Sequence, residues 1–210
     1  MKRTSIAAVA LAAVIGASPV LAQNSKEHPQ GTEHPKSSEH PASTDPMMKA
    51  WMEFATPGAP HQGLLGMVGT WDTTVKFFMD PANPSESKGT STYTSLLDGR
   101  YVQEVADGSA MGMPFHGLGI YGYDNLTKKY VSCWIDNMGT GLMTGTGSMS
   151  ADGKMLTWMS TSSDPMSGKE QSYRSTMLQA TADQYVFEMF GPGPEGKEAK
   201  MMSITYNRRK

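Results

Sequence analysis

Gly69-Thr70-Trp71 opens a segment of alternating residues, whose shared face carries Trp71, Thr73, Val75 and Phe77. Alternation with a period of two predicts a half-buried β-strand. A glycine can start such a strand in tight contact with its neighbours, and a large aromatic side chain two residues later can fill the closed end of a barrel. The stretch therefore predicts the first strand of a β-barrel, with Gly69 and Trp71 in structural roles.

The chain after Gly69 shows the same alternation, interrupted by turn signals such as Asp98-Gly99 and Asp152-Gly153. This spacing predicts about ten strands. No segment between them has the helical period and length of a crossover connection, so the strands should be antiparallel and should close to remove their edges. We predict an all-β fold: a single antiparallel up-and-down barrel over residues 69–210, preceded by short helices in residues 46–68.

The first of these helices is predicted from a capping signal and an apolar stripe. Asp45 and Pro46 suit the N-cap and the first helical position, and Thr56-Pro57-Gly58 should end the helix. One face of the helix carries Met48, Trp51, Met52 and Ala55. We expect this helix to cover or flank the barrel, followed by a short helical turn over residues 61–68.

Residues 1–22 have the organisation of a secretory signal peptide. A basic start is followed by an apolar stretch and by Val20-Leu21-Ala22, which predicts cleavage near Ala22. No later segment has the apolar length needed to span a bilayer. The expected location is the periplasm or the medium outside a bacterium. The formal charge of -2 gives no support to a nucleic-acid partner.

Residues 23–45 are polar and rich in Pro and Ser, which predicts a disordered linker. Glu-His-Pro recurs three times within it, which places His28, His34 and His40 six residues apart. Histidines in such a tract are weak candidates for metal ligands. In an extended polyproline helix successive histidines lie about 19 Å apart. A solvated linker and a metal site both remain open.

One glycine pattern matches a nucleotide-binding motif only by its letters. Gly117, Gly119 and Gly122 fit G-x-G-x-x-G, but they fall inside an alternating strand with no helix behind it. Their expected role is steric: Gly117 and Gly119 share a face and should leave unfilled room inside the barrel.

Several longer motifs carry a family resemblance: Gly69-Thr70-Trp71, Met111 to Phe115, Trp134 to Gly141, Asp164 to Lys169 and Ile204-Thr205-Tyr206. From His61 to its end the chain resembles the bacterial domain of unknown function 1579 family. The resemblance implies a calycin-like barrel, often exported, and it implies no particular activity.

Related barrels suggest two further expectations. Lipocalins are similar in pairing the Trp of the first strand with an Arg of the last, a position that Arg208 takes here. Haem-binding barrels of the nitrobindin kind use a histidine late in the chain, whereas this chain has none after His116. We therefore predict no cofactor, and haem in particular is not expected.

Polar residues at inward positions are the candidates for a ligand site. Trp134 and Asp136 share one strand face, and Arg174 is a charge in the middle of a strand. We expect a pocket in which Asp136 and Arg174 hold the polar end of a ligand and Tyr121, Tyr123 and Trp134 form the walls. The alternative is that Arg174 is a surface charge or belongs to a structural ion pair with Glu188.

Three classes of function follow. The leading hypothesis is an exported protein that binds a small apolar or amphipathic molecule. The second is binding of soft copper ions through methionines and the histidine tail. The third is an enzyme of unknown reaction, for which Asp136 and His116 are the acid–base candidates. Because no nucleophile stands out, we assign no catalytic residue. The sequence does not predict an oligomeric state.

Overall fold

A computed structural model describes residues 45–193 and 197–210. The predicted signal peptide and residues 23–44 of the predicted linker, including His28, His34 and His40, lie outside the described residues.

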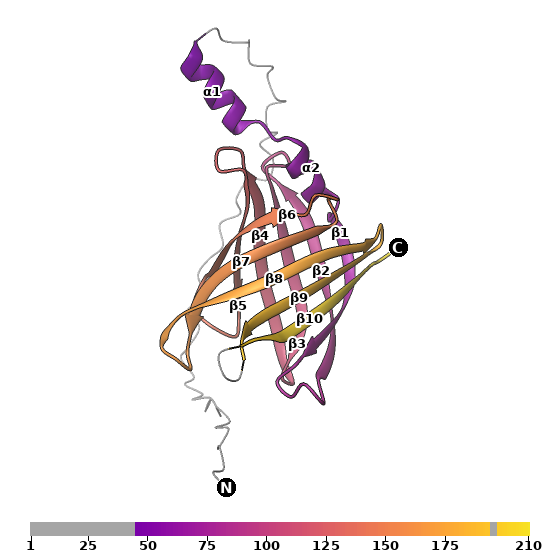
Figure 1. The fold of residues 1–210 in the computed structure, drawn as a ribbon. Coiled ribbons are helices and arrows are strands. Elements are labelled where there is room, and N and C mark those ends of the chain that lie inside the picture. Colours follow the sequence, from indigo (N-terminus) through magenta and orange to yellow (C-terminus); the bar gives the residue numbers. More distant parts are fainter. Residues whose placement is uncertain (1–44, 194–196) are drawn as a thin grey trace, which may run out of the picture. The chain divides into compact units, whose positions relative to one another are not determined.

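The described residues form two α-helices followed by ten β-strands (Figure 1). The helices are α1 (Pro46–Ala55) and α2 (Ala59–Leu65). The strands are β1 (Gly69–Phe77), β2 (Ser85–Leu96), β3 (Tyr101–Ala110), β4 (Met113–Asp124), β5 (Lys129–Asp136), β6 (Met143–Met149), β7 (Met155–Asp164), β8 (Lys169–Thr181), β9 (Gln184–Pro192) and β10 (Glu198–Arg208). Each strand is antiparallel to the next, and β1 also pairs with β10. The prediction of one closed antiparallel barrel is confirmed.

Trp71 and Arg208 meet where β1 pairs with β10. The two residues are direct partners in the register, and the Arg208 guanidinium carbon lies 4.1 Å from the centre of a Trp71 ring. Arg208 also donates hydrogen bonds to the carbonyl oxygens of Val68 and Gly66 at 2.9 and 2.8 Å. The Trp71 indole N–H donates to the carbonyl of Met67 at 2.8 Å. The clasp of Trp71 and Arg208 therefore ties the first strand, the last strand and the end of α2 together.

Gly69 gives this clasp the room that it needs. Its φ of +132° is a backbone conformation that favours glycine, and a Cβ atom there would lie 2.9 Å from Nη1 of Arg208. Any other residue at position 69 would be strained and would also push the guanidinium away.

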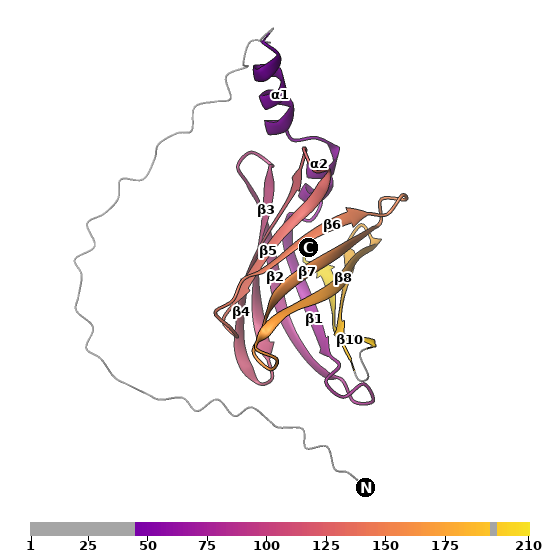
Figure 2. The ribbon, with the colours of Figure 1, turned by 60° about the vertical axis from the view of Figure 1, so that its left-hand side comes forward.

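Helix α2 lies at the barrel end where β1 begins (Figures 1 and 2). Leu64 is buried in the aromatic core of the barrel. His61 is also buried, and its ring meets Tyr123 edge to face at 5.7 Å. Its Nδ1 accepts a hydrogen bond from the backbone N–H of Gly58 at 3.0 Å. This end of the barrel is therefore packed by side chains from α2 and from the strands.

The expectation that Gly117 and Gly119 leave unfilled volume is wrong. A Cβ at Gly117 would lie 2.3 Å from the Trp134 ring, and one at Gly119 would lie 2.8 Å from the Tyr121 hydroxyl. The space that a side chain at position 147 would take is likewise filled, by the ring of Trp158, the cross-strand partner of Gly147. The glycines give space to aromatic rings that lie close to the strand backbone.

The clasp predicts a non-additive loss of stability. Trp71→Ala removes a fully buried side chain and should lower the free energy of unfolding by about 3 to 5 kcal/mol, and Arg208→Ala should cost less. Because the two side chains touch, the double variant should differ from the sum of the single variants by about 0.5 to 3 kcal/mol. Denaturant unfolding of the wild type, the two single variants and the double variant measures this difference. Additive losses would show that the contact between the two side chains contributes no interaction free energy.

Candidate functional site

The inward-facing side chains of the barrel form two zones. The zone next to α2 is a buried core of Leu64, Trp71, Tyr93, Val102, Tyr130, Leu156, Trp158, Tyr185 and Tyr206. The other zone approaches the end away from α2, where loops 78–84, 111–112, 137–142 and 165–168 connect the strands. We call this end the mouth. Its inward side chains stay partly exposed, and they include Val75, Trp134, Met143, Tyr173, Phe187 and Met189. The barrel thus has a packed half and a half with accessible apolar surface.

Small hydroxyl side chains lie between the two zones. Thr73, Ser91, Ser160 and Ser175 all face inward and are buried. They come from four different strands, so the polar groups are spread around the wall of the barrel. A molecule that entered from the mouth would meet apolar walls first and hydroxyl groups behind them.

Glu104 is the centre of this polar layer. It faces inward from β3, and only 2% of its surface is exposed. Ser91 donates a hydrogen bond to one carboxyl oxygen at 2.8 Å and Tyr121 donates to the other at 2.8 Å. The Tyr206 hydroxyl lies 3.4 Å from the same oxygen as Ser91. A buried carboxyl group is therefore surrounded by hydroxyls.

The surroundings favour the uncharged form of this carboxyl. Burial raises the pKa of Glu104 above its ordinary value, although hydrogen bonds from Ser91 and Tyr121 act in the opposite direction. Burial, followed by the nearby Glu104, also raises the pKa values of Tyr93, Tyr121 and Tyr206. The three phenols therefore stay protonated. The buried Tyr93 hydroxyl adds a third phenol beside this carboxyl.

Trp134 and Asp136 lie together on the inner face of β5, at the mouth. The Trp134 indole N–H donates to Oδ2 of Asp136 at 2.8 Å, and its ring stacks on Phe115 with the centroids 6.4 Å apart. Oδ1 of Asp136 accepts a hydrogen bond from the backbone N–H of Met138 at 2.9 Å. Asp136 therefore fixes the orientation of Trp134 and the turn that follows β5.

Tyr121 and Tyr123 face inward from β4, nearer to α2. Tyr121 is bound to Glu104, as described above. Tyr123 packs edge to face on Tyr130, with the centroids 5.0 Å apart, and on His61. Tyr121 thus belongs to the hydroxyl layer around Glu104, whereas Tyr123 belongs to the packed end.

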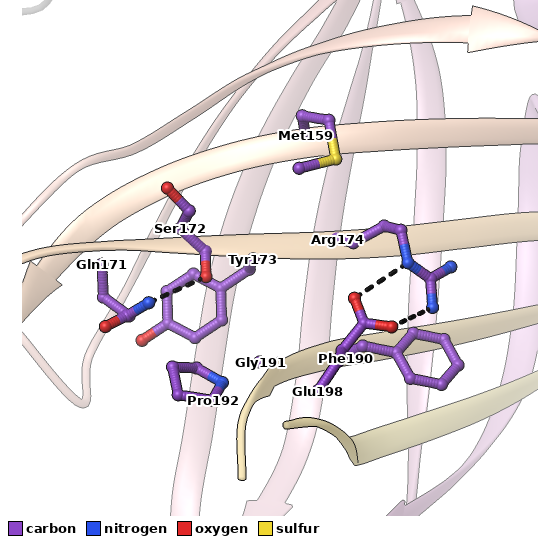
Figure 3. A pocket seen from close by; sticks show the side chains of 9 residues that line it. All are labelled: Met159, Gln171, Ser172, Tyr173, Arg174, Phe190, Gly191, Pro192 and Glu198. Atoms are coloured by element: carbon purple, nitrogen blue, oxygen red, sulfur yellow. Dashed lines mark hydrogen bonds and ion pairs between the residues drawn. The ribbon is translucent and has the colours of Figure 1, made fainter. Parts of the chain in front are cut away.

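Arg174 does not join Asp136. It lies on the face of β8 opposite to the buried Ser175, and its guanidinium binds both carboxyl oxygens of Glu198 at 2.9 and 2.7 Å (Figure 3). Its guanidinium carbon also lies 4.1 Å from the centre of the Phe190 ring. A pocket of about 450 Å³ borders these side chains. The expected single cavity with Asp136 and Arg174 at its polar end is therefore wrong, because the two residues lie on opposite faces of the barrel wall.

The other charged candidates also lie on the outer face. Glu188 pairs with Lys200 and not with Arg174. His116 alternates with the inward Gly117, and its Nδ1 lies 2.6 Å from Oδ1 of Asp107 with both side chains well exposed. The described part of the chain groups no three His, Cys, Asp or Glu side chains in a way that could hold a metal ion. No described helix is long and apolar enough to cross a membrane.

Glu104 is the site residue that the sequence interpretation missed. The signal was present, because Val102, Glu104 and Ala106 occupy alternate positions and Val102 is an inward apolar residue. An acidic residue in phase with apolar neighbours indicates a buried carboxyl group.

Comparisons with known proteins give the family of the chain and support its barrel fold. A family model described as protein of unknown function (DUF1579) matches residues 56–208, and the chain belongs to this family. No curated protein is significantly similar to the chain.

Two solved structures illustrate the similarity. The structure of Rv2717c from M. tuberculosis is 14% identical, has a TM-score of 0.52, and is matched over 73% of this chain and 100% of that chain. The S-type phycobiliprotein lyase CPES from Guillardia theta is 14% identical with a TM-score of 0.49, over 76% of this chain and 97% of that chain. The first similarity supports the fold alone.

Glu104 should make stability fall as pH rises. A carboxyl whose folded-state pKa is raised stabilises the fold fully below its ordinary pKa of 4.5, and this contribution is lost as pH rises through the folded-state pKa. Glu104→Gln has an uncharged side chain of similar shape at every pH. Relative to the wild type, the variant should gain free energy of unfolding as the pH rises from about 4.5 upward, by about 1.4 kcal/mol per unit of pKa elevation.

Denaturant unfolding across this pH range makes the measurement. Glu170→Gln, at an exposed position on β8, is the matched control and should not reproduce the trend. A constant difference between Glu104→Gln and the wild type would contradict the buried neutral carboxyl.

Proposed function

We propose that this protein is exported and binds a small apolar or amphipathic molecule in the mouth half of its barrel. The observation that carries the proposal is the partial exposure of inward-facing apolar side chains such as Val75, Phe187 and Met189. A closed barrel covers these side chains from outside, so their exposed surface faces the interior. Apolar interior surface with a few polar groups is the usual lining of a small-molecule site. The composition of residues 1–22 supports export.

Methionines give the mouth an adaptable lining. Four mouth loops each carry one exposed methionine: Met79, Met111, Met138 and Met166. Met143 and Met189 continue this lining on the inner wall. Methionine side chains are flexible and polarisable, which suits apolar ligands of irregular shape. Apolar contacts would therefore contribute more to the binding free energy than a rigid set of hydrogen-bond partners would.

The ionisable groups of the interior restrict the head group of the ligand. Glu104 and Asp136 face inward, whereas Arg174 and Lys200 form their ion pairs on the outer face. A carboxylate or phosphate on the ligand would therefore meet no compensating cation beside the hydroxyl layer, and burying an unpaired charge is costly. The favoured ligand is neutral, with hydroxyl or carbonyl groups that can hydrogen-bond to Ser160 or Ser175.

The proposal predicts binding of an apolar probe that is sensitive to interior volume. N-phenyl-1-naphthylamine, which is neutral, should bind with enhanced fluorescence. It should bind at least tenfold more tightly than dansylaminoundecanoate, which carries a carboxylate. Val75→Phe enlarges an inward side chain and should weaken binding of the neutral probe at least fivefold. Lys76→Phe, on the outer face of the same strand, is the matched control and should leave binding unchanged.

Two results would contradict the proposal. One is the absence of probe binding to a folded protein, and the other is an equal loss of binding in both variants. Native mass spectrometry of protein purified from its own host is a second test, because it would detect a retained organic ligand directly. A retained copper ion in place of an organic molecule would favour the soft-metal alternative.

A further inference from the structure

Helix α1 presents an apolar face that is largely exposed. Its exposed side chains are Met47 (68% exposed), Met48 (47%), Trp51 (63%) and Phe54 (47%), and α1 contains no buried residue. Together with Met52 and Ala55 they span roughly 160° of the helix circumference at 3.6 residues per turn. Lys49 and Glu53 occupy the opposite side and approach each other to 3.9 Å. The helix is thus strongly amphipathic, with its apolar side in water.

The helix is held in place although its apolar face is free. The Asn125 side-chain amide, in the loop between β4 and β5, donates hydrogen bonds to the carbonyl oxygens of Phe54 and Thr56 at 3.0 and 2.8 Å. Thr56 also donates to the carbonyl of Met52 at 2.6 Å. At the N-terminus, Asp45 accepts a hydrogen bond from the N–H of Met47. Both ends of α1 are therefore capped, and one of them is attached to the barrel.

Loops at the same end of the barrel add exposed apolar side chains. Leu126, next to Asn125, is 78% exposed, and Leu97, in the loop between β2 and β3, is 69% exposed. Gly99 of this second loop packs against Leu65 of α2. Leu126 and Leu97 thus add exposed apolar surface at the barrel end to which α1 is attached.

We propose that α1 docks the protein on the surface of a lipid bilayer, with its apolar face inserted at the level of the headgroups. An amphipathic helix with Trp, Phe and Met on one face is the kind that lies in a membrane interface. A tryptophan in this position is favoured, because its ring is apolar and its N–H can remain hydrated.

A second copy of the chain fits the face less well. A helix of ten residues is about 15 Å long and about 10 Å wide. The face of α1 by itself is therefore smaller than the roughly 800 Å² of accessible surface that each partner buries in a stable interface. A bilayer needs no matching surface of that size. Because Lys49 and Glu53 balance each other, apolar insertion and not charge should drive the contact.

Vesicle binding tests this proposal independently of the ligand site. The full chain, expressed with its leader and purified after export, is mixed with vesicles of phosphatidylcholine alone or with added anionic phosphatidylglycerol, and sedimented. We expect comparable binding to both. Met47→Glu should lower the partition constant at least fivefold, and Trp51→Glu should repeat the loss. Met159→Glu makes the same change at a 55% exposed methionine on the outer face of β7 and should leave vesicle binding unchanged.

Thermal unfolding of each variant should match the wild type, because α1 buries no side chain. Three outcomes would overturn the proposal. The first is no sedimentation of the wild type with either vesicle. The second is binding only to anionic vesicles, which would show attraction by charge. The third is a dimer by light scattering that Met47→Glu converts to a monomer, which would show that a second copy covers the face.

Discussion

The barrel depends on one long-range contact, the pairing of β1 with β10 around Trp71 and Arg208. Without it the ten strands would form an open sheet with two unpaired edges, and the interior would not exist as an enclosed space. The guanidinium satisfies carbonyl groups at the end of α2, 140 and 142 residues away in sequence, while its flat face covers the indole ring. A lysine would not reproduce this arrangement, because it lacks both the planar stacking surface and the fork of donors.

Closure also determines the chemistry of the interior. Once ten strands enclose it, a charge inside cannot be stabilised by water, and the cost falls mainly on the ionised form of Glu104. Hydroxyl donors from β2, β4 and β10 surround the carboxyl without adding a positive charge. Aromatic rings from β4, β5 and β7 lie against glycine backbone, which lets large side chains share a narrow barrel. The polar centre and the aromatic packing are thus two consequences of one closed wall.

Sequence patterns predicted the wall better than its contents. Alternation and turn dipeptides predicted the strands correctly. The shared face of Trp134 and Asp136 corresponds to a hydrogen bond between the two side chains. Arg174 was misplaced because both alternating sets of β8 contain small polar residues, so the sequence does not show which set faces inward. Glu104 was missed because acidic residues are expected at the surface. The glycines showed where side chains are missing but not which rings fill the space. The apolar face of α1 was predicted, with the helix expected to cover or to flank the barrel; its exposed side chains and its attachment through Asn125 favour the flanking position.

The positions of α1 and the mouth constrain how the two proposed activities would combine. Asn125 attaches α1 at the end of the barrel that α2 closes, whereas the mouth loops lie at the opposite strand ends. A protein docked on lipid through α1 would therefore hold its mouth away from the bilayer. A ligand drawn directly out of the membrane would need the reverse orientation. The arrangement instead suits a binding protein that stays at a membrane surface and takes up neutral, sparingly soluble molecules from the aqueous side.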